Sequence, residues 1–120
     1  MTLNSERHMY MQIIEMIEDG ILSGTYRTDD LIISTPQISK LLSVNPTTAQ
    51  RAIGVLTDRG IIYKKRGVGM AVTEGAHDMI LSKRQQAFYE RGVSDFINGA
   101  RKIGITDEEL IKLIKENLHD

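Results

Sequence analysis

Apolar residues recur at helical spacing through the first part of the chain. They return every three or four residues, which predicts an amphipathic helix over about residues 5–22. The recurring positions are Tyr10, Ile13, Ile14, Ile17 and Ile21. Gly24 follows as a C-cap glycine, and the apolar run at 31–33 predicts a brief strand or a buried connector.

Two shorter helices are expected next, joined by a tight turn at residues 43–44. Ser34 or Thr35 caps the first, and Pro36 occupies its first position. Asn45 and Pro46 begin the second in the same way, and this helix extends to about residue 59. The positions expected to face inward are Ile38, Leu41, Leu42, Ala49, Ala52, Ile53 and Leu56. This order predicts a helix-turn-helix.

Two β-prone runs follow, at residues 61–64 and 70–73. The loop between them is basic at its start and contains Gly67 and Gly69, which permit the positive φ of a hairpin turn. A hairpin directly after a helix-turn-helix predicts a winged helix-turn-helix domain over residues 1–74.

The pattern changes in residues 75–120. Helical spacing extends over 77–103, although Gly92 predicts a kink, a break or a close helix contact. Gly104 ends this segment, and Thr106 and Glu109 form a capping box that begins a last helix. That helix is expected to bury Leu110, Ile111, Leu113, Ile114 and Leu118. The predicted fold is mainly α with a small β-hairpin: a winged helix-turn-helix domain plus a short C-terminal two-helix appendage.

The apolar residues of this appendage are too many to remain on the surface of a monomer. They predict a dimerisation appendage and therefore a homodimer. The expected interface residues are Phe88, Phe96, Ile97, Ile103, Leu110, Leu113 and Ile114.

Charge is concentrated where the motif lies. The whole chain has a net charge of −1, but residues 37–69 hold six basic residues and one acidic residue, a local net charge of +5. Local positive charge attracts phosphate, so a double-stranded DNA operator is the expected partner. The third helix would enter the major groove and the wing the adjacent minor groove. The candidate DNA-binding residues are Ser34, Thr35, Asn45, Thr47, Thr48, Gln50, Arg51, Lys64, Arg66, Gly67 and Gly69.

Composition excludes several classes. The chain has no cysteine, and its three histidines are scattered, so neither a metal site nor a cofactor is expected. No nucleophile–base–orienter set can be assembled, so we do not expect an enzyme. No apolar run approaches the ~20 residues of a membrane span, and no signal peptide is recognisable. A cytoplasmic protein is expected.

The ordered motifs resemble the GntR family of bacterial transcription regulators. The resemblance rests on Val44-Asn45-Pro46, Thr48 and Arg51-Ala52 combined with the wing sequence Arg66-Gly67-x-Gly69. The short tail is similar to that of the YtrA subfamily, which implies a dimerisation appendage in place of a large effector domain. The subfamily resemblance also implies control of an operon for an ABC transporter or for cell-envelope stress.

One departure concerns DNA contact, because Pro36 stands where the family often has an arginine that reaches the DNA. The sequence leaves two alternatives to a homodimeric repressor on a near-palindromic operator. One is a metabolite-sensing regulator with a pocket at the tail or dimer interface. The other is a winged helix used for protein contact. Whether a small-molecule effector exists is not predicted.

Overall fold

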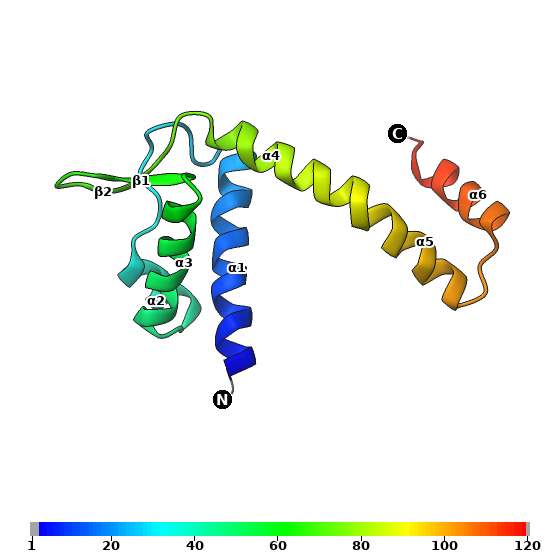
Figure 1. Cartoon of the computed structure of the whole chain (residues 1–120), viewed down its shortest axis with the longest axis horizontal. Helices are drawn as coiled ribbons and strands as arrows, with labels where there is room; N and C mark the ends of the chain where they lie inside the picture. The colour runs from blue at the N-terminus through cyan, green and yellow to red at the C-terminus, as the bar shows by residue number, and fades with distance from the viewer. Residues whose placement is uncertain (1–2, 120) are drawn as a thin grey trace. The chain divides into compact units, whose positions relative to one another are not determined.

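The computed structural model describes residues 3–119, with side chains from His8 onward, and it is mostly helical with one antiparallel sheet (Figure 1). The elements, in order, are α1 (Leu3–Leu22), α2 (Thr35–Leu42), α3 (Pro46–Asp58), β1 (Ile62–Lys65), β2 (Gly69–Val72), α4 (Ala76–Ala87), the π-helical η1 (Phe88–Gly92), α5 (Val93–Lys102) and α6 (Asp107–Asn117). The chain divides into two compact units between Leu81 and Ser82, within α4. The division of function between residues 1–74 and 75–120 stays a prediction.

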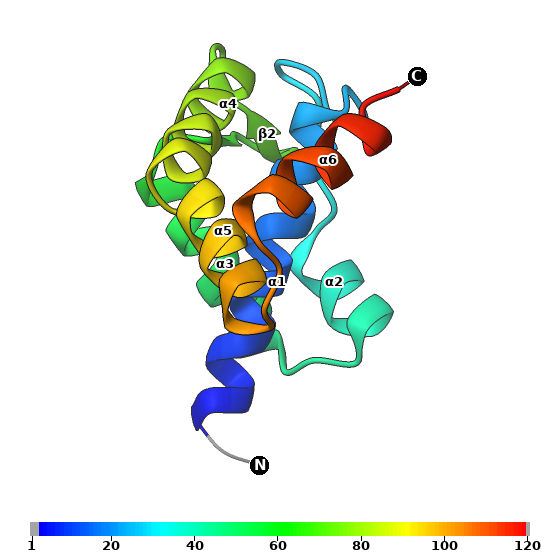
Figure 2. The same cartoon turned by 90° about the vertical axis from the view of Figure 1, so that its right-hand side faces the viewer.

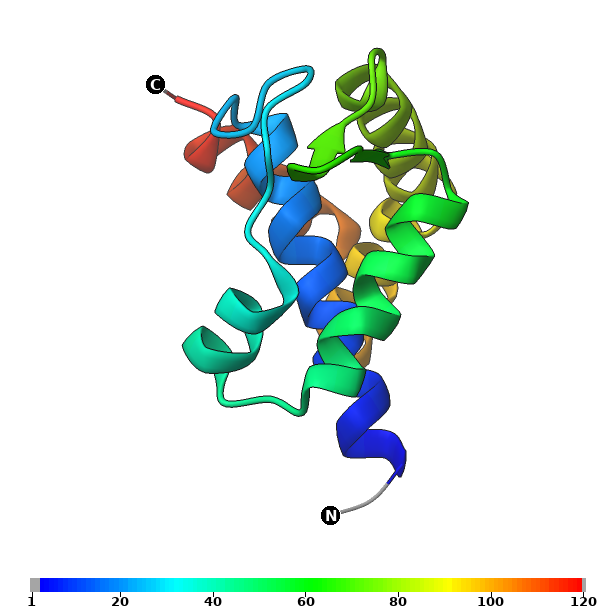
Figure 3. The ribbon, with the colours of Figure 1, turned by 90° about the vertical axis from the view of Figure 1, so that its left-hand side faces the viewer.

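The first unit is built around α1, which contacts α3, while α2 packs on α3 as well (Figure 3). The core is aliphatic, as the helical spacing predicts. Its largest fully buried side chains are Ile13, Ile17, Ile38, Leu56, Ile62, Val72 and Ile80. Burial of these side chains supplies the main stabilising free energy of the unit.

The caps of the two short helices follow the sequence closely. Ser34 is the N-cap of α2, and its side chain accepts a hydrogen bond from the backbone N–H of Gln37 in a full capping box. Pro36 therefore occupies the second helical position rather than the first. Asn45 caps α3, with Pro46 at its first position as predicted.

The prediction that Leu41 faces inward is wrong, because its side chain is 64% exposed. The helix α2 has only eight residues. Ile38 and Leu42, four residues apart, face the core on one narrow stripe, and Leu41 lies beside that stripe.

In the wing, Ile62 pairs with Val72 and Lys65 pairs with Gly69. Strand β1 lies one residue later than predicted, and β2 lies one residue earlier. The apolar run before α2 lies along the wing without forming a strand. Leu31 makes an isolated bridge with Ala71, and the Ile32 N–H donates to the Met70 carbonyl at 2.9 Å. Of the two alternatives open for this run, the structure has the buried connector: Leu31 forms only an isolated bridge, and Ile32 is buried.

In the second unit, α5 and α6 contact each other (Figure 2). Thr106 and Glu109 form the predicted capping box at the start of α6. The Gly92 region is a π-helical turn, and the ring of Phe88 packs so closely on Gly92 that a Cβ there would lie 3.0 Å from it. Of the apolar positions that the last helix was expected to bury, only Leu110 is buried by its own chain. Ile111, Leu113, Ile114 and Leu118 are exposed, because α5 alone covers too little of α6.

Candidate nucleic-acid interface

The first turns of α3 present polar side chains at helical spacing. Thr47 and Gln50 are exposed and lie three residues apart on one face of the helix, whereas Thr48 is half-buried. Asn45 uses its side chain as a cap, since its Oδ1 accepts from the Thr47 N–H at 2.9 Å. No hydrogen bond to another described residue holds the Gln50 amide. Gln50 is therefore free to hydrogen-bond a base edge.

Arg51 is held by the first helix. Its guanidinium lies over the ring of Tyr10, with the guanidinium carbon 4.3 Å from the ring centroid. This is a cation–π arrangement, which covers one face of the guanidinium and leaves the N–H donors at its edge available. The sequence predicted a DNA contact for Arg51 but assigned Tyr10 only to the core. Helical spacing could not show that α1 and α3 bring these two side chains together.

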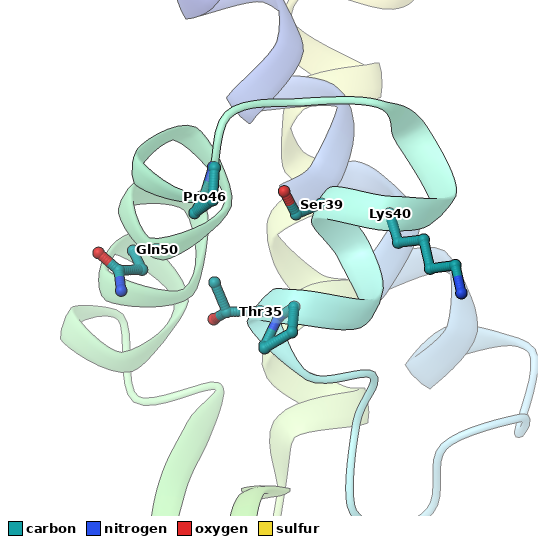
Figure 4. A pocket seen from close by; sticks show the side chains of 6 residues that line it. Thr35, Ser39, Lys40, Pro46 and Gln50 are labelled. Carbon is teal, nitrogen blue, oxygen red and sulfur yellow. The ribbon is translucent and has the colours of Figure 1, made fainter.

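The start of α2 lies next to α3. Ser34 is engaged in its capping box, with the Gln37 Oε1 accepting from the Ser34 N–H at 2.9 Å. Thr35 is half-buried and faces an open groove between α2 and α3 (Figure 4). The groove is lined by Thr35, Pro36, Ser39, Lys40, Pro46 and Gln50. The structure thus brings Thr35 and Gln50, which are 15 positions apart in the sequence, to one surface.

The wing carries the remaining predicted contacts. Lys64, Arg66, Gly67 and Gly69 are all exposed on the hairpin, and Gly67 has the positive φ of +75° that its turn requires. Arg66 lies in the turn between β1 and β2. A cation at an exposed hairpin turn can enter a narrow minor groove.

Asp29 is a residue of this region that sequence reasoning missed. Its Oδ1 accepts a 2.7 Å hydrogen bond from the Tyr63 hydroxyl, and its carbonyl accepts from the Lys65 Nζ at 3.5 Å. The hydrogen bond to Asp29 raises the pKa of Tyr63 above its ordinary value. Asp29 has a φ of +68°, a conformation that aspartate tolerates better than most residues. The loop before α2 thereby anchors the base of the wing.

The basic residues of the first unit differ in their partners. Arg59, at the end of α3, is paired with Glu18 of α1 at 3.6 Å. Apart from Arg59, the exposed cations of the helix-turn-helix and the wing are Lys40, Arg51, Lys64, Lys65 and Arg66. These side chains supply the positive charge that contact with phosphate requires.

Among the described side chains, from His8 to His119, no three histidine or acidic groups are clustered to hold a metal ion. The described helices also include none with the length and hydropathy of a membrane span.

The predicted interface residues of the second unit fall into three groups. Phe88, Phe96, Ile103, Leu113 and Ile114 are exposed, Ile97 is half-buried, and Leu110 is buried by its own chain. Five of the seven line an apolar groove of about 710 Å³ between α5 and α6; they are Phe96, Ile103, Leu110, Leu113 and Ile114. Phe88 lies outside this groove, with its ring edge-on to Tyr89.

Comparison with known proteins places these features in a family. Residues 9–72 match the model of the bacterial regulatory proteins of the gntR family. The chain is 28% identical to the HTH-type transcriptional repressor YtrA of Bacillus subtilis (strain 168), over 93% of this chain and 85% of that protein.

Two solved structures are also similar to this chain in fold and sequence. A putative transcriptional regulator of the GntR family from Bacteroides thetaiotaomicron is 33% identical, with a TM-score of 0.70 over 91% of this chain and 96% of the other. The AraR DNA-binding domain, solved in complex with operator ORR3, is 30% identical with a TM-score of 0.51, over 53% of this chain and 77% of the other.

These matches confirm the winged helix-turn-helix and the resemblance to YtrA-type regulators. The family consists of DNA-binding transcriptional regulators and not of enzymes. On its fold and the family match over residues 9–72, this chain belongs to the GntR family of bacterial transcriptional regulators.

Proposed function

We propose that this protein is a repressor that binds a near-palindromic operator as a homodimer, acting in the cytoplasm. Two helix-turn-helix units related by a two-fold axis would meet half-sites about one helical turn (~34 Å) apart, or a multiple of it. The C-terminal unit would pair the two chains.

The observation that carries the dimer proposal is the exposed apolar face of α5 and α6. Phe96 is 55% exposed and Ile103 76% exposed, and both line the groove with Leu113. Large apolar side chains grouped in this way mark an interaction surface. A second copy of the same unit offers the same apolar groups and would bury both faces in an isologous interface.

Repression and the regulated genes rest on similarity. The YtrA relative is named a repressor and aligns with nearly the whole of this chain, appendage included. The subfamily resemblance of the sequence extends the proposal to an operon for an ABC transporter or for envelope stress. Mapping the DNA that the protein protects upstream of its own gene tests this part.

The same groove supports a second candidate, a metabolite-sensing regulator. Its volume of about 710 Å³ lies within the ~300–1,000 Å³ of small-molecule pockets, and its lining is apolar. A ligand there would compete with the second copy or be covered by it. The third candidate, a winged helix used for protein contact, predicts DNA binding that is weak and insensitive to salt, since phosphate contacts must weaken as salt rises.

The test compares the full chain with Phe96→Glu. Sedimentation at micromolar concentration should give a dimer for the full chain and a monomer for the variant, because the glutamate would be an unpaired charge in an apolar interface. The full chain should bind a two-half-site operator much more tightly than a half-site, since the second contact becomes intramolecular. Lys112→Glu on an exposed position of α6, outside the groove, is the matched control and should stay dimeric. A monomeric full chain that binds the whole operator tightly would reject the dimer proposal.

A further inference from the structure

The groove between α2 and α3 has an unusual chemistry for a nucleic-acid interface. Its walls are formed by two proline rings, Pro36 on α2 and Pro46 on α3, together with Thr35 (Figure 4). The hydroxyl of Ser39 does not serve the groove as a donor, because it donates to the Val44 carbonyl of the turn. The centre of the groove therefore offers mainly carbon.

The rim of the groove is polar. Lys40 lies at the α2 side, and the amide of Gln50 lies at the α3 side. No described residue holds the Gln50 amide by a hydrogen bond. A partner must therefore combine a small apolar group with hydrogen-bonding edges and a nearby negative charge.

The major groove of DNA offers this combination at one base. Thymine alone among the four bases carries a methyl group there, and a glutamine can form two hydrogen bonds with the N6 and N7 of adenine. A phosphate would fit the rim but not the carbon-lined centre. Charge complementarity with Lys40, which lines the groove, favours DNA over an apolar protein segment.

We propose that this groove receives the 5-methyl group of a thymine, while Gln50 reads an adenine in the adjacent base pair. The proposal rests on the operator binding proposed above, and it names one feature of the operator sequence that the protein reads. Pro36 and Thr35 then act as specificity-determining residues through contact with the methyl group rather than through hydrogen bonds.

The experiment first selects an operator from a random duplex pool with the full-length protein. Each thymine of the selected half-site is then replaced by deoxyuridine, which removes the methyl group and keeps base pairing. One thymine should be sensitive, with affinity falling about fourfold, the effect of exposing ~one methyl-sized group. Replacing the same thymine by deoxyuridine should change DNA affinity little for the variant Thr35→Ser/Pro36→Ala, because this variant lacks the Thr35 methyl group and the Pro36 ring of the groove.

Two controls keep the result interpretable. Leu41→Ala changes an exposed apolar residue of α2 outside the groove, and it should keep the fourfold sensitivity. Thermal unfolding followed by circular dichroism checks that the groove variant is folded. Its sensitivity is the ratio of its own affinities for the thymine and the deoxyuridine operators, which is compared with the same ratio for the wild type.

The possible failures are distinguishable. An operator on which no deoxyuridine replacement matters, or a groove variant as sensitive as the wild type, would overturn this inference and leave operator binding intact. Failure to enrich any sequence would overturn the operator proposal and this inference together.

Discussion

The stacking of Arg51 on Tyr10 allows a quantitative prediction about DNA binding. The guanidinium carbon lies 4.3 Å from the ring centroid, and the two residues belong to α3 and α1. A cation–π contact at an exposed site contributes ~0.5–1 kcal/mol. If the contact pre-organises Arg51 for DNA, its loss should lower operator affinity about two- to fivefold, since 1.4 kcal/mol is tenfold.

The assay is a double-mutant cycle on operator affinity, measured by gel shift or fluorescence anisotropy. Arg51→Ala should cost more than ~1 kcal/mol, the lower range for a good base or phosphate contact. Tyr10→Leu should cost two- to fivefold in the wild type and almost nothing in the Arg51→Ala background. Tyr10→Phe retains the ring and should bind normally.

Arg59→Ala is the matched control, because it also removes one arginine of the α3 region. Arg59 pairs with Glu18 on α1 and is not placed at the predicted interface. Its loss should lower affinity much less than the loss of Arg51. The reasoning is refuted if a folded Arg51→Ala protein binds like the wild type, or if Tyr10→Leu weakens binding equally in both backgrounds.

Three further predictions concern the wing and the second unit. Arg66→Ala should reduce affinity most on operators with A·T-rich flanks, where the minor groove is narrow; equal losses on G·C-rich flanks in gel shifts would make it a plain phosphate contact. Thr106→Ala removes the N-cap of α6 and should destabilise the protein by ~1 kcal/mol in denaturant unfolding, whereas Ser82→Ala within α4 should not. Asp107 accepts from the Arg101 Nε and Nη2 at 3.1 and 3.0 Å, which lowers the pKa of its carboxyl. The stabilisation from this ion pair is therefore complete above the ordinary pKa of 3.8 and is lost as pH falls through the lower folded-state pKa. Unfolding free energy measured against pH in acid should fall more steeply for the wild type than for Arg101→Gln. Identical pH profiles would contradict this.

Local interactions could be predicted from the sequence because they depend on neighbours along the chain. The capping residues Ser34, Asn45 and Thr106 are all in place, since each cap bonds a backbone N–H only two or three residues away. The wing follows from two β-prone runs and the positive φ of its glycines. The α1 periodicity likewise identified Ile13 and Ile17, both fully buried, because a helix with one apolar face has only one way to bury it.

The tertiary structure decided what depends on two distant segments meeting. Tyr10 covers Arg51 only because α1 packs on α3, and Asp29 anchors Tyr63 only because the loop before α2 pairs with β2. Leu41 has the spacing expected of a buried residue, but on the short α2 its side chain stays exposed. Periodicity thus determined which side chains could be buried or free, and the packing of helices and strands determined which of them found a neighbour.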